Sequence, residues 1–113
     1  MVNKLIITPR QAGKTTWLVN QYQEGDVIIT PNEMMGINIR KIRRDAVCRT
    51  GSKIQRMLNS REVVSRLLVE EYFCLNLADR ESLLLYSNRY DIPIIAVGTS
   101  NRLYNLSLIE AFR

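Results

Sequence analysis

The chain has 113 residues, which suits a single domain spanning 1–113, and it carries a net charge of +5. Its composition, 46% apolar and 24% charged, is that of a globular protein, and no apolar run is long enough to span a bilayer. The absence of histidine excludes Ser-His and Cys-His catalysis and histidine metal sites. The two cysteines form no metal-type cluster, and the N-terminus lacks the layout of a signal peptide. We therefore expect a cytoplasmic protein with reduced thiols and no membrane partner.

Short apolar runs alternate with helix-like segments along the chain. The expected strands are 4–8, 27–30, the centre of 63–70, and 92–97. The expected helices are 14–23, 32–44, 53–59, 79–90 and 107–112, with a turn at 50–52. This alternation predicts βαβ crossovers and an α/β fold of three layers, in which helices flank a small, mostly parallel β-sheet. Because such sheets bind ligands beyond the carboxyl ends of their strands, the informative residues should follow each strand.

The segment from Thr8 to Thr15, TPRQAGKT, matches the phosphate-binding pattern G-x-x-x-x-G-K-[ST] except at its first position. A loop between a strand and a helix can turn successive backbone N–H groups onto a phosphate. Gly13 would allow close backbone approach, Lys14 would reach the β- and γ-phosphates, and the Thr15 hydroxyl would bind Mg²⁺. Thr8 replaces the usual glycine, and because it precedes proline it should be extended. A chance turn containing a lysine is the alternative.

Carboxylates and hydroxyls follow two later strands. Glu70 and Glu71 follow an apolar strand in the manner of a Walker B element, in which Glu70 would hold Mg²⁺ and Glu71 would polarise the attacking water. Glu70 stands where aspartate is usual, so its carboxylate reaches one methylene further. Thr99 and Asn101 follow the last strand and could contact the γ-phosphate or the lytic water. At each place the alternative is an ordinary solvated turn.

These motifs resemble those of a known family. The segment 10–15 (RQAGKT) resembles the deviant Walker A of phage terminase large subunits, 69–71 (VEE) is similar to their Walker B, and 98–103 (GTSNRL) resembles their coupling motif. The same order occurs in superfamily 1-type helicase domains. The resemblance, from about residue 5 to 106, implies a RecA-like or ASCE-type P-loop NTPase core. The sequence departs from the family at Thr8 and Glu70, and it holds neither a nuclease domain nor a second motor domain.

The family roles carry over by position. The implied catalytic residues are Lys14, Glu71 and Arg10, and the implied Mg²⁺ ligands are Thr15 and Glu70. The expected cofactors are ATP and Mg²⁺. The residues expected to bind the nucleotide are Pro9, Arg10, Gln11, Ala12, Gly13, Lys14, Thr15, Thr16, Thr99 and Asn101.

The expected function is a Mg²⁺-dependent nucleoside triphosphatase, with ATP as substrate. The resemblance implies a DNA-linked motor or a packaging or helicase-type subunit of viral or mobile-element origin, located in the host cytoplasm if viral. An arginine from a neighbouring subunit could complete the site, so a homo-oligomer or larger complex is a candidate.

Two alternative functions remain open. One is a thymidine-type deoxynucleoside kinase, in which Glu71 would take the nucleoside proton. Those enzymes cover the base with a segment that usually carries zinc-binding cysteines, and only 15 residues, none of them cysteine, follow Gly98. The other is a nucleotide-binding regulatory or assembly factor with little turnover.

Basic residues are concentrated in the segment 40–66, where only Asp45 and Glu62 oppose them. The nine are Arg40, Lys41, Arg43, Arg44, Arg49, Lys53, Arg56, Arg61 and Arg66. A local excess of this kind attracts polyanions, and a solvated helical face is the alternative. The sequence therefore offers DNA as a partner, through Arg40, Lys41, Arg43 and Arg44.

Overall fold

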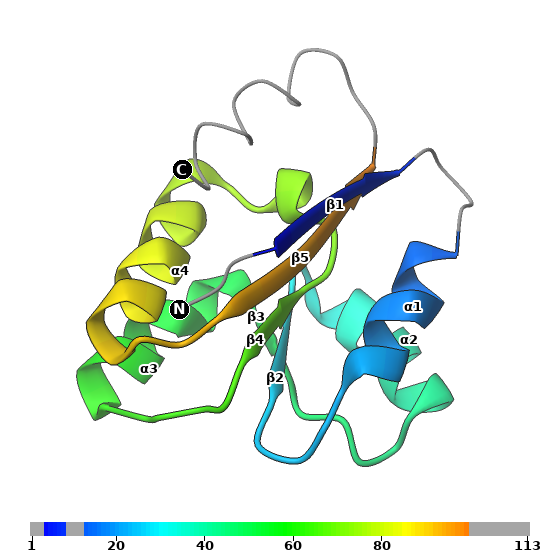
Figure 1. The fold of residues 1–113 in the computed structure, drawn as a ribbon, viewed down its shortest axis with the longest axis horizontal. Coiled ribbons are helices and arrows are strands. Elements are labelled where there is room, and N and C mark those ends of the chain that lie inside the picture. Colours follow the sequence, from blue (N-terminus) through cyan, green and yellow to red (C-terminus); the bar gives the residue numbers. More distant parts are fainter. Residues whose placement is uncertain (1–3, 9–12, 100–113) are drawn as a thin grey trace.

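The computed structural model describes residues 4–8 and 13–99. Strands and helices alternate along this part of the chain (Figure 1). The strands are β1 (Lys4–Thr8), β2 (Val27–Thr30), β3 (Cys48–Thr50), β4 (Leu67–Val69) and β5 (Ile94–Thr99). The helices are α1 (Lys14–Gln21), α2 (Glu33–Ile42), α3 (Ile54–Ser60) and α4 (Leu77–Tyr90), with two 3₁₀ helices, η1 (Gly51–Lys53) and η2 (Tyr72–Cys74).

The five strands form one parallel sheet in the order β1-β5-β4-β2-β3. β5 therefore lies between β1 and β4. Thr8 at the end of β1 is paired with Thr99 at the end of β5, while Val69 at the end of β4 is paired with Ala96. The chain that follows β4 consequently runs past the last residues of β5, so the ends of these three strands form one edge.

Helices cover both faces of the sheet (Figure 1). α1 and α2 lie on one face, where Leu18 and Ile39 pack with Ile28 of β2 and Leu68 of β4. α3 and α4 lie on the other face, and a second core there contains the buried side chains of Ile54, Met57, Leu83, Tyr86, Ile29, Val69 and Ala96. Burial on both faces explains why β2 and β4 appear in the sequence as continuous apolar runs.

The expected α/β fold, with a sheet flanked by helices, is confirmed, and within the described residues the sheet is entirely parallel rather than mostly so. The prediction of four strands was wrong, because β3 occupies the end of the region that was expected to be a connection and a turn. β3 has three residues, all half-buried, at the edge of the sheet, and therefore shows no apolar run. The helix expected at 107–112 lies outside the described residues.

Asparagine side chains set the starts of two helices. The side chain of Asn32 accepts a hydrogen bond from the backbone N–H of Met35 (3.0 Å), and α2 begins at the next residue. Asn76 caps α4 in the same way through the N–H of Asp79 (2.8 Å), which places the start of α4 at Leu77 rather than at the expected residue 79. Within the described residues, none of the helices has the length and apolar character needed to cross a membrane.

Candidate functional site

Helix α1 begins directly after a glycine that has a left-handed backbone. Gly13 has φ 72° and ψ 23°, a region that side-chain-bearing residues adopt at a cost. A Cβ at this position would meet nothing within 4 Å, so the backbone conformation, rather than lack of space, favours glycine. Among the described residues, no side chain caps α1, and its first turn contains no acidic residue. The first N–H groups of α1, next to Lys14 and Thr15, are thus not capped by any described side chain.

Glu70 lies buried directly after β4, with 1% of its surface exposed. Its Oε1 accepts a hydrogen bond of 2.9 Å from the hydroxyl of Thr15. Its Oε2 is buried, and no described residue bonds to it. Burial raises the pKa of the Glu70 carboxyl, and the negative charge of Glu71 raises it further, while the hydrogen bond from Thr15 and the charge of Lys14 lower it. A cation at Oε2 would offset the burial of this carboxylate.

Glu71 also reaches this edge of the sheet, although it is adjacent to Glu70. Consecutive residues of a strand point to opposite faces, but Glu71 is left-handed, with φ 50° and ψ 62°. Its Oε1 lies 3.0 Å from Lys14 Nζ, and both side chains are mostly buried. The hydroxyl of Thr99 donates to the same carboxylate, 2.9 Å from Oε1 and 3.1 Å from Oε2. Glu71 therefore joins α1 to the end of β5.

Residues not identified from the sequence hold the segment after Glu71 against β5. A Cβ on Gly98 would lie 2.7 Å from the ring of Phe73, so glycine at this position allows η2 to pack closely. Arg80 of α4 donates to the backbone carbonyls of Phe73 (2.8 Å) and Leu75 (3.0 Å), and its guanidinium lies over the ring of Tyr72. Gly98, directly after the expected strand 92–97, was the only sequence signal for this packing, and Arg80 gave none.

We call Lys14, Thr15, Glu70, Glu71 and Thr99 the strand-end cluster. Its oxygen atoms fit a magnesium ion, which prefers oxygen ligands and keeps several from water and phosphate. Thr15 and the unpartnered Oε2 of Glu70 would be the protein's contribution. No group of three or more His, Cys, Asp or Glu side chains that could hold a metal occurs in the described ranges. A cation bound here would thus take most of its ligands from other molecules.

Other predicted site residues are not among the five residues of the described cluster. Thr16 is exposed on α1, away from the hydrogen bonds of the cluster. Five residues expected in the site, Pro9, Arg10, Gln11, Ala12 and Asn101, lie outside the described residues. The structure therefore brings together one part of the predicted set, which comes from the start of α1, the end of β4 and the end of β5.

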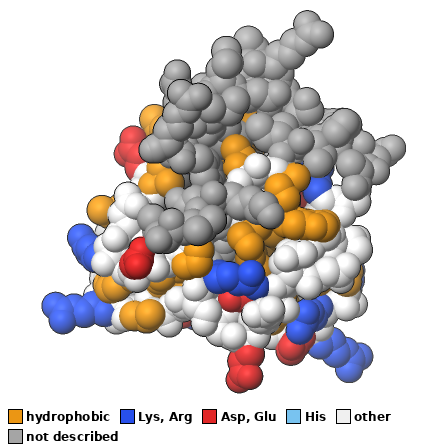
Figure 2. All heavy atoms as spheres, in the orientation of Figure 1, with side chains coloured by type: hydrophobic (Ala, Val, Ile, Leu, Met, Phe, Trp, Pro, Cys, Tyr) orange, Lys and Arg blue, Asp and Glu red, His pale blue; other side chains and the backbone are white. Residues whose placement is uncertain are grey.

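The basic segment 40–66 does not form one continuous surface. Arg43 lies against Tyr22: its guanidinium donates to the Tyr22 carbonyl (2.8 Å), pairs with Asp45 and lies over the Tyr22 ring. Arg49 pairs with Glu62, and Arg66 pairs with buried Asp26. Figure 2 likewise shows described Lys and Arg side chains scattered among acidic ones on the face that it draws. Of the four residues expected to contact DNA, Arg40, Lys41 and Arg44 are exposed.

Comparison with known proteins identifies no family for this chain, because no family model and no curated protein matches it. The fold that the structure supports is a small α/β domain with a five-stranded parallel sheet flanked by four helices. Any function must therefore be argued from the contacts of the strand-end cluster.

Proposed function

We propose that this protein is a P-loop nucleoside triphosphatase that hydrolyses ATP with Mg²⁺. The observation that supports this most is the convergence of two residues of α1 with two carboxylates after β4. Lys14 lies 3.0 Å from Glu71, and Thr15 lies 2.9 Å from Glu70. A cation, a hydroxyl and two carboxylates at the start of a helix are the groups that phosphate and magnesium require.

Glu70 and Thr15 would hold the metal ion. The Glu70 carboxylate is buried and bonded through one oxygen only, which leaves Oε2 for a cation. Bound Mg²⁺ would neutralise charge on the β- and γ-phosphates. The extra methylene of glutamate, compared with aspartate, matches its position at the sheet edge, where it reaches Thr15 on α1.

Lys14 and Glu71 would separate when the nucleotide binds. The phosphates compete with Glu71 for the Lys14 ammonium, which is the main side-chain cation of the cluster. Glu71 keeps the hydrogen bond from Thr99 and is thereby held in place. It can then orient a water molecule and accept its proton, as the water oxygen bonds to the γ-phosphorus and the bond to the β-phosphate oxygen breaks.

Turnover assays test this proposal and its two alternatives together. Release of phosphate would be measured with Mg²⁺ plus ATP or GTP, and formation of thymidine monophosphate with ATP plus thymidine. Each assay would be run with and without single-stranded and duplex DNA. Mg²⁺-dependent ATP hydrolysis supports the proposal, and stimulation by DNA would add the motor role. Thymidine phosphorylation would replace it with the kinase. Binding without turnover would replace it with a regulatory factor.

A further inference from the structure

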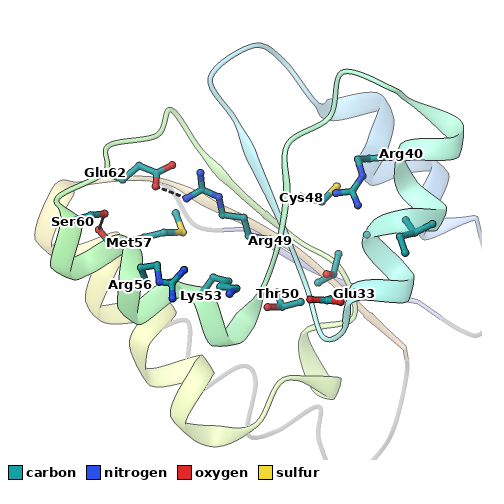
Figure 3. Close-up of a pocket in the computed structure, with 13 residues that line it drawn as sticks. Glu33, Arg40, Cys48, Arg49, Thr50, Lys53, Arg56, Met57, Ser60 and Glu62 are labelled. Carbon is teal, nitrogen blue, oxygen red and sulfur yellow. Dashed lines mark hydrogen bonds and ion pairs between the residues drawn. The ribbon is translucent and has the colours of Figure 1, made fainter.

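A second candidate site lies along the edge strand of the sheet, away from the strand-end cluster. A cavity of about 660 Å³ runs beside β3 between α2 and α3 (Figure 3). Its size is within the range of sites for small ligands. We call it the edge cavity; its lining includes Thr30, Gly36, Arg40, Cys48, Lys53 and Arg56. Because β3 is the last strand in the order, one of its edges faces no other strand of the described sheet.

Positive charge from separate elements lines the edge cavity. Arg40 comes from α2, Lys53 from η1 and Arg56 from α3. Figure 3 shows Arg40 beside Cys48 on one wall, with Lys53 and Arg56 next to each other on the opposite wall. None of these three cations is within salt-bridge distance of a described carboxylate. Three cations thus face the cavity, and no described carboxylate forms a salt bridge with any of them.

The remaining charges do not cancel this excess. Arg49, on the floor of the cavity, is paired with Glu62, so these two side chains largely neutralise each other. Glu33 is the other carboxylate in the lining. The absence of a side chain at Gly36 leaves the guanidinium of Arg40 near this position, 4.0 Å from where a Cβ would stand. The cavity therefore has a net positive charge when it holds no ligand.

The edge cavity lies on the other side of β2 from the strand-end cluster. The carboxylates of the cluster, Glu70 and Glu71, follow β4, and β4 lies two strand spacings of about 4.8 Å each from β3, or roughly 10 Å. None of the five residues of the cluster lines the cavity. The cations of the edge cavity therefore form a group distinct from the hydrogen-bonded residues of the cluster.

We propose that the edge cavity is a second anion site, which binds the phosphate group of a phosphorylated ligand through Arg40, Lys53 and Arg56. Guanidinium groups bind phosphate with two parallel hydrogen bonds, and ammonium adds a point charge. The hydroxyls of Thr30, Thr50 and Ser60 also line the cavity. None of the described residues that line the cavity carries an aromatic ring on which a base could stack, so the phosphate itself is the recognised group. The phosphate can belong to a free mononucleotide or to a nucleic-acid strand.

Calorimetry with paired variants tests the site. The probes are inorganic phosphate, thymidine monophosphate and a short oligothymidylate. Lys53→Gln/Arg56→Gln should weaken binding more than tenfold, since each lost contact involves a charged group. Lys41→Gln/Arg44→Gln removes the same charge from exposed positions outside the lining and should change affinity less than twofold. Equal losses in the two pairs, or no binding of any probe, would overturn the proposal. The probe that binds tightest identifies the source of the phosphate.

The two cysteines locate the bound phosphate. Cys48 lines the edge cavity, whereas Cys74 is exposed in η2 near the strand-end cluster. A ligand in the cavity should slow alkylation of Cys48 severalfold and leave Cys74 unchanged, as measured by mass spectrometry. Burial raises the pKa of the Cys48 thiol, so the reaction is run at alkaline pH. Binding that persists in Lys14→Ala separates this site from the proposed ATP site. Loss of binding in Lys14→Ala, or protection of Cys74 alone, would assign the phosphate to the strand-end cluster instead.

Discussion

The strand-end cluster and the edge cavity belong to the same parallel sheet, but they differ in how their charged side chains are paired. In the strand-end cluster, Lys14 is paired with Glu71, and Glu70 is bonded to Thr15. The edge cavity instead presents Arg40, Lys53 and Arg56 without a described carboxylate partner. In the first region most charged side chains are partnered within the cluster, although its two carboxylates exceed its one cation, whereas the second carries positive charge without a described partner.

This difference predicts different responses to a ligand. In the strand-end cluster, a phosphate must displace Glu71 from Lys14, so binding rearranges side chains that are already in contact. In the edge cavity, a phosphate finds exposed cations and breaks no ion pair. Ligand binding should therefore rearrange the side chains of the strand-end cluster and leave those of the edge cavity largely in place. The predictions below begin with the largest expected effect.

Replacing Lys14 tests the strand-end cluster most directly. Lys14→Ala removes its only side-chain cation, so we expect a loss of ATP turnover on the order of a thousandfold, comparable to the loss of other preorganised charges at phosphoryl transfer sites. Lys41→Ala, an exposed lysine on α2, is the matched control and should retain activity. Turnover and calorimetric ATP binding would both be measured on variants whose circular dichroism matches the wild type. Unchanged affinity in Lys14→Ala would remove the basis for the P-loop assignment.

Arg66 shows that not every cation of the basic segment is available to a ligand. Its guanidinium donates to buried Asp26, at 2.6 Å from Nη2 and 3.2 Å from Nε, and to the carbonyl of Gln21. Arg66→Ala leaves the Asp26 charge buried without its main partner and should cost about 3 kcal/mol of unfolding free energy. Arg56→Ala, in the edge cavity, should change it by no more than about 0.5 kcal/mol. Urea unfolding of both variants measures the change in unfolding free energy. Similar losses in the two variants would contradict the distinction between a structural Arg66 and an available Arg56.

The two adjacent glutamates should separate binding from chemistry. Glu71→Gln should slow ATP hydrolysis about a hundredfold while Mg-ATP still binds, because a lost general base affects the chemical step. Glu70→Gln should instead raise the Mg²⁺ concentration needed for half-maximal binding, because Glu70 is bonded to Thr15 and not to Lys14. Single-turnover kinetics and Mg²⁺ titrations distinguish the two outcomes. Wild-type turnover in Glu71→Gln would assign the base to another residue.

Sequence patterns predicted the fold correctly where an element is determined by its own consecutive residues. The runs at 4–8 and 27–30 match β1 and β2 to the residue, because proline follows each apolar run and the residues of β2 are buried on both faces. β3 gave no such signal, since Cys48, Arg49 and Thr50 are half-buried at an edge. The strand order also has no local signature, because pairing between β1 and β5 joins residues from opposite ends of the described chain.

The site could be predicted only in part for the same reason. The spacing of glycine, lysine and threonine placed Lys14 and Thr15 at the start of α1, and the acids after an apolar strand placed Glu70 and Glu71. No sequence pattern predicted the left-handed backbone of Glu71, and this backbone conformation brings its carboxylate to Lys14 and Thr99. The edge cavity could not be predicted from the sequence either, because its cations come from three elements whose separation depends on the fold.

The smallest predicted effect is a pH dependence of stability that originates at Glu70. Burial raises the pKa of this carboxyl above the ordinary glutamate value of about 4.3, so the native state binds a proton more tightly than the unfolded state. In the interval between the unfolded and folded pKa values, the native state holds more protons. The unfolding free energy of the metal-free protein should therefore fall as pH rises through this interval.

Glu70→Gln isolates this contribution, because glutamine keeps the shape and cannot ionise. The variant should lose the downward slope and, above the interval, be more stable than the wild type in EDTA. Glu24 is an exposed acid that precedes β2, so Glu24→Gln should keep the slope. Urea unfolding at a series of pH values measures all three proteins. Saturating Mg-ATP should reverse the difference, because a cation at Oε2 favours the charged carboxylate that only the wild type provides. An unchanged slope in Glu70→Gln would mean that Glu70 is already neutralised within the fold, and the cluster would then lack a site for the metal.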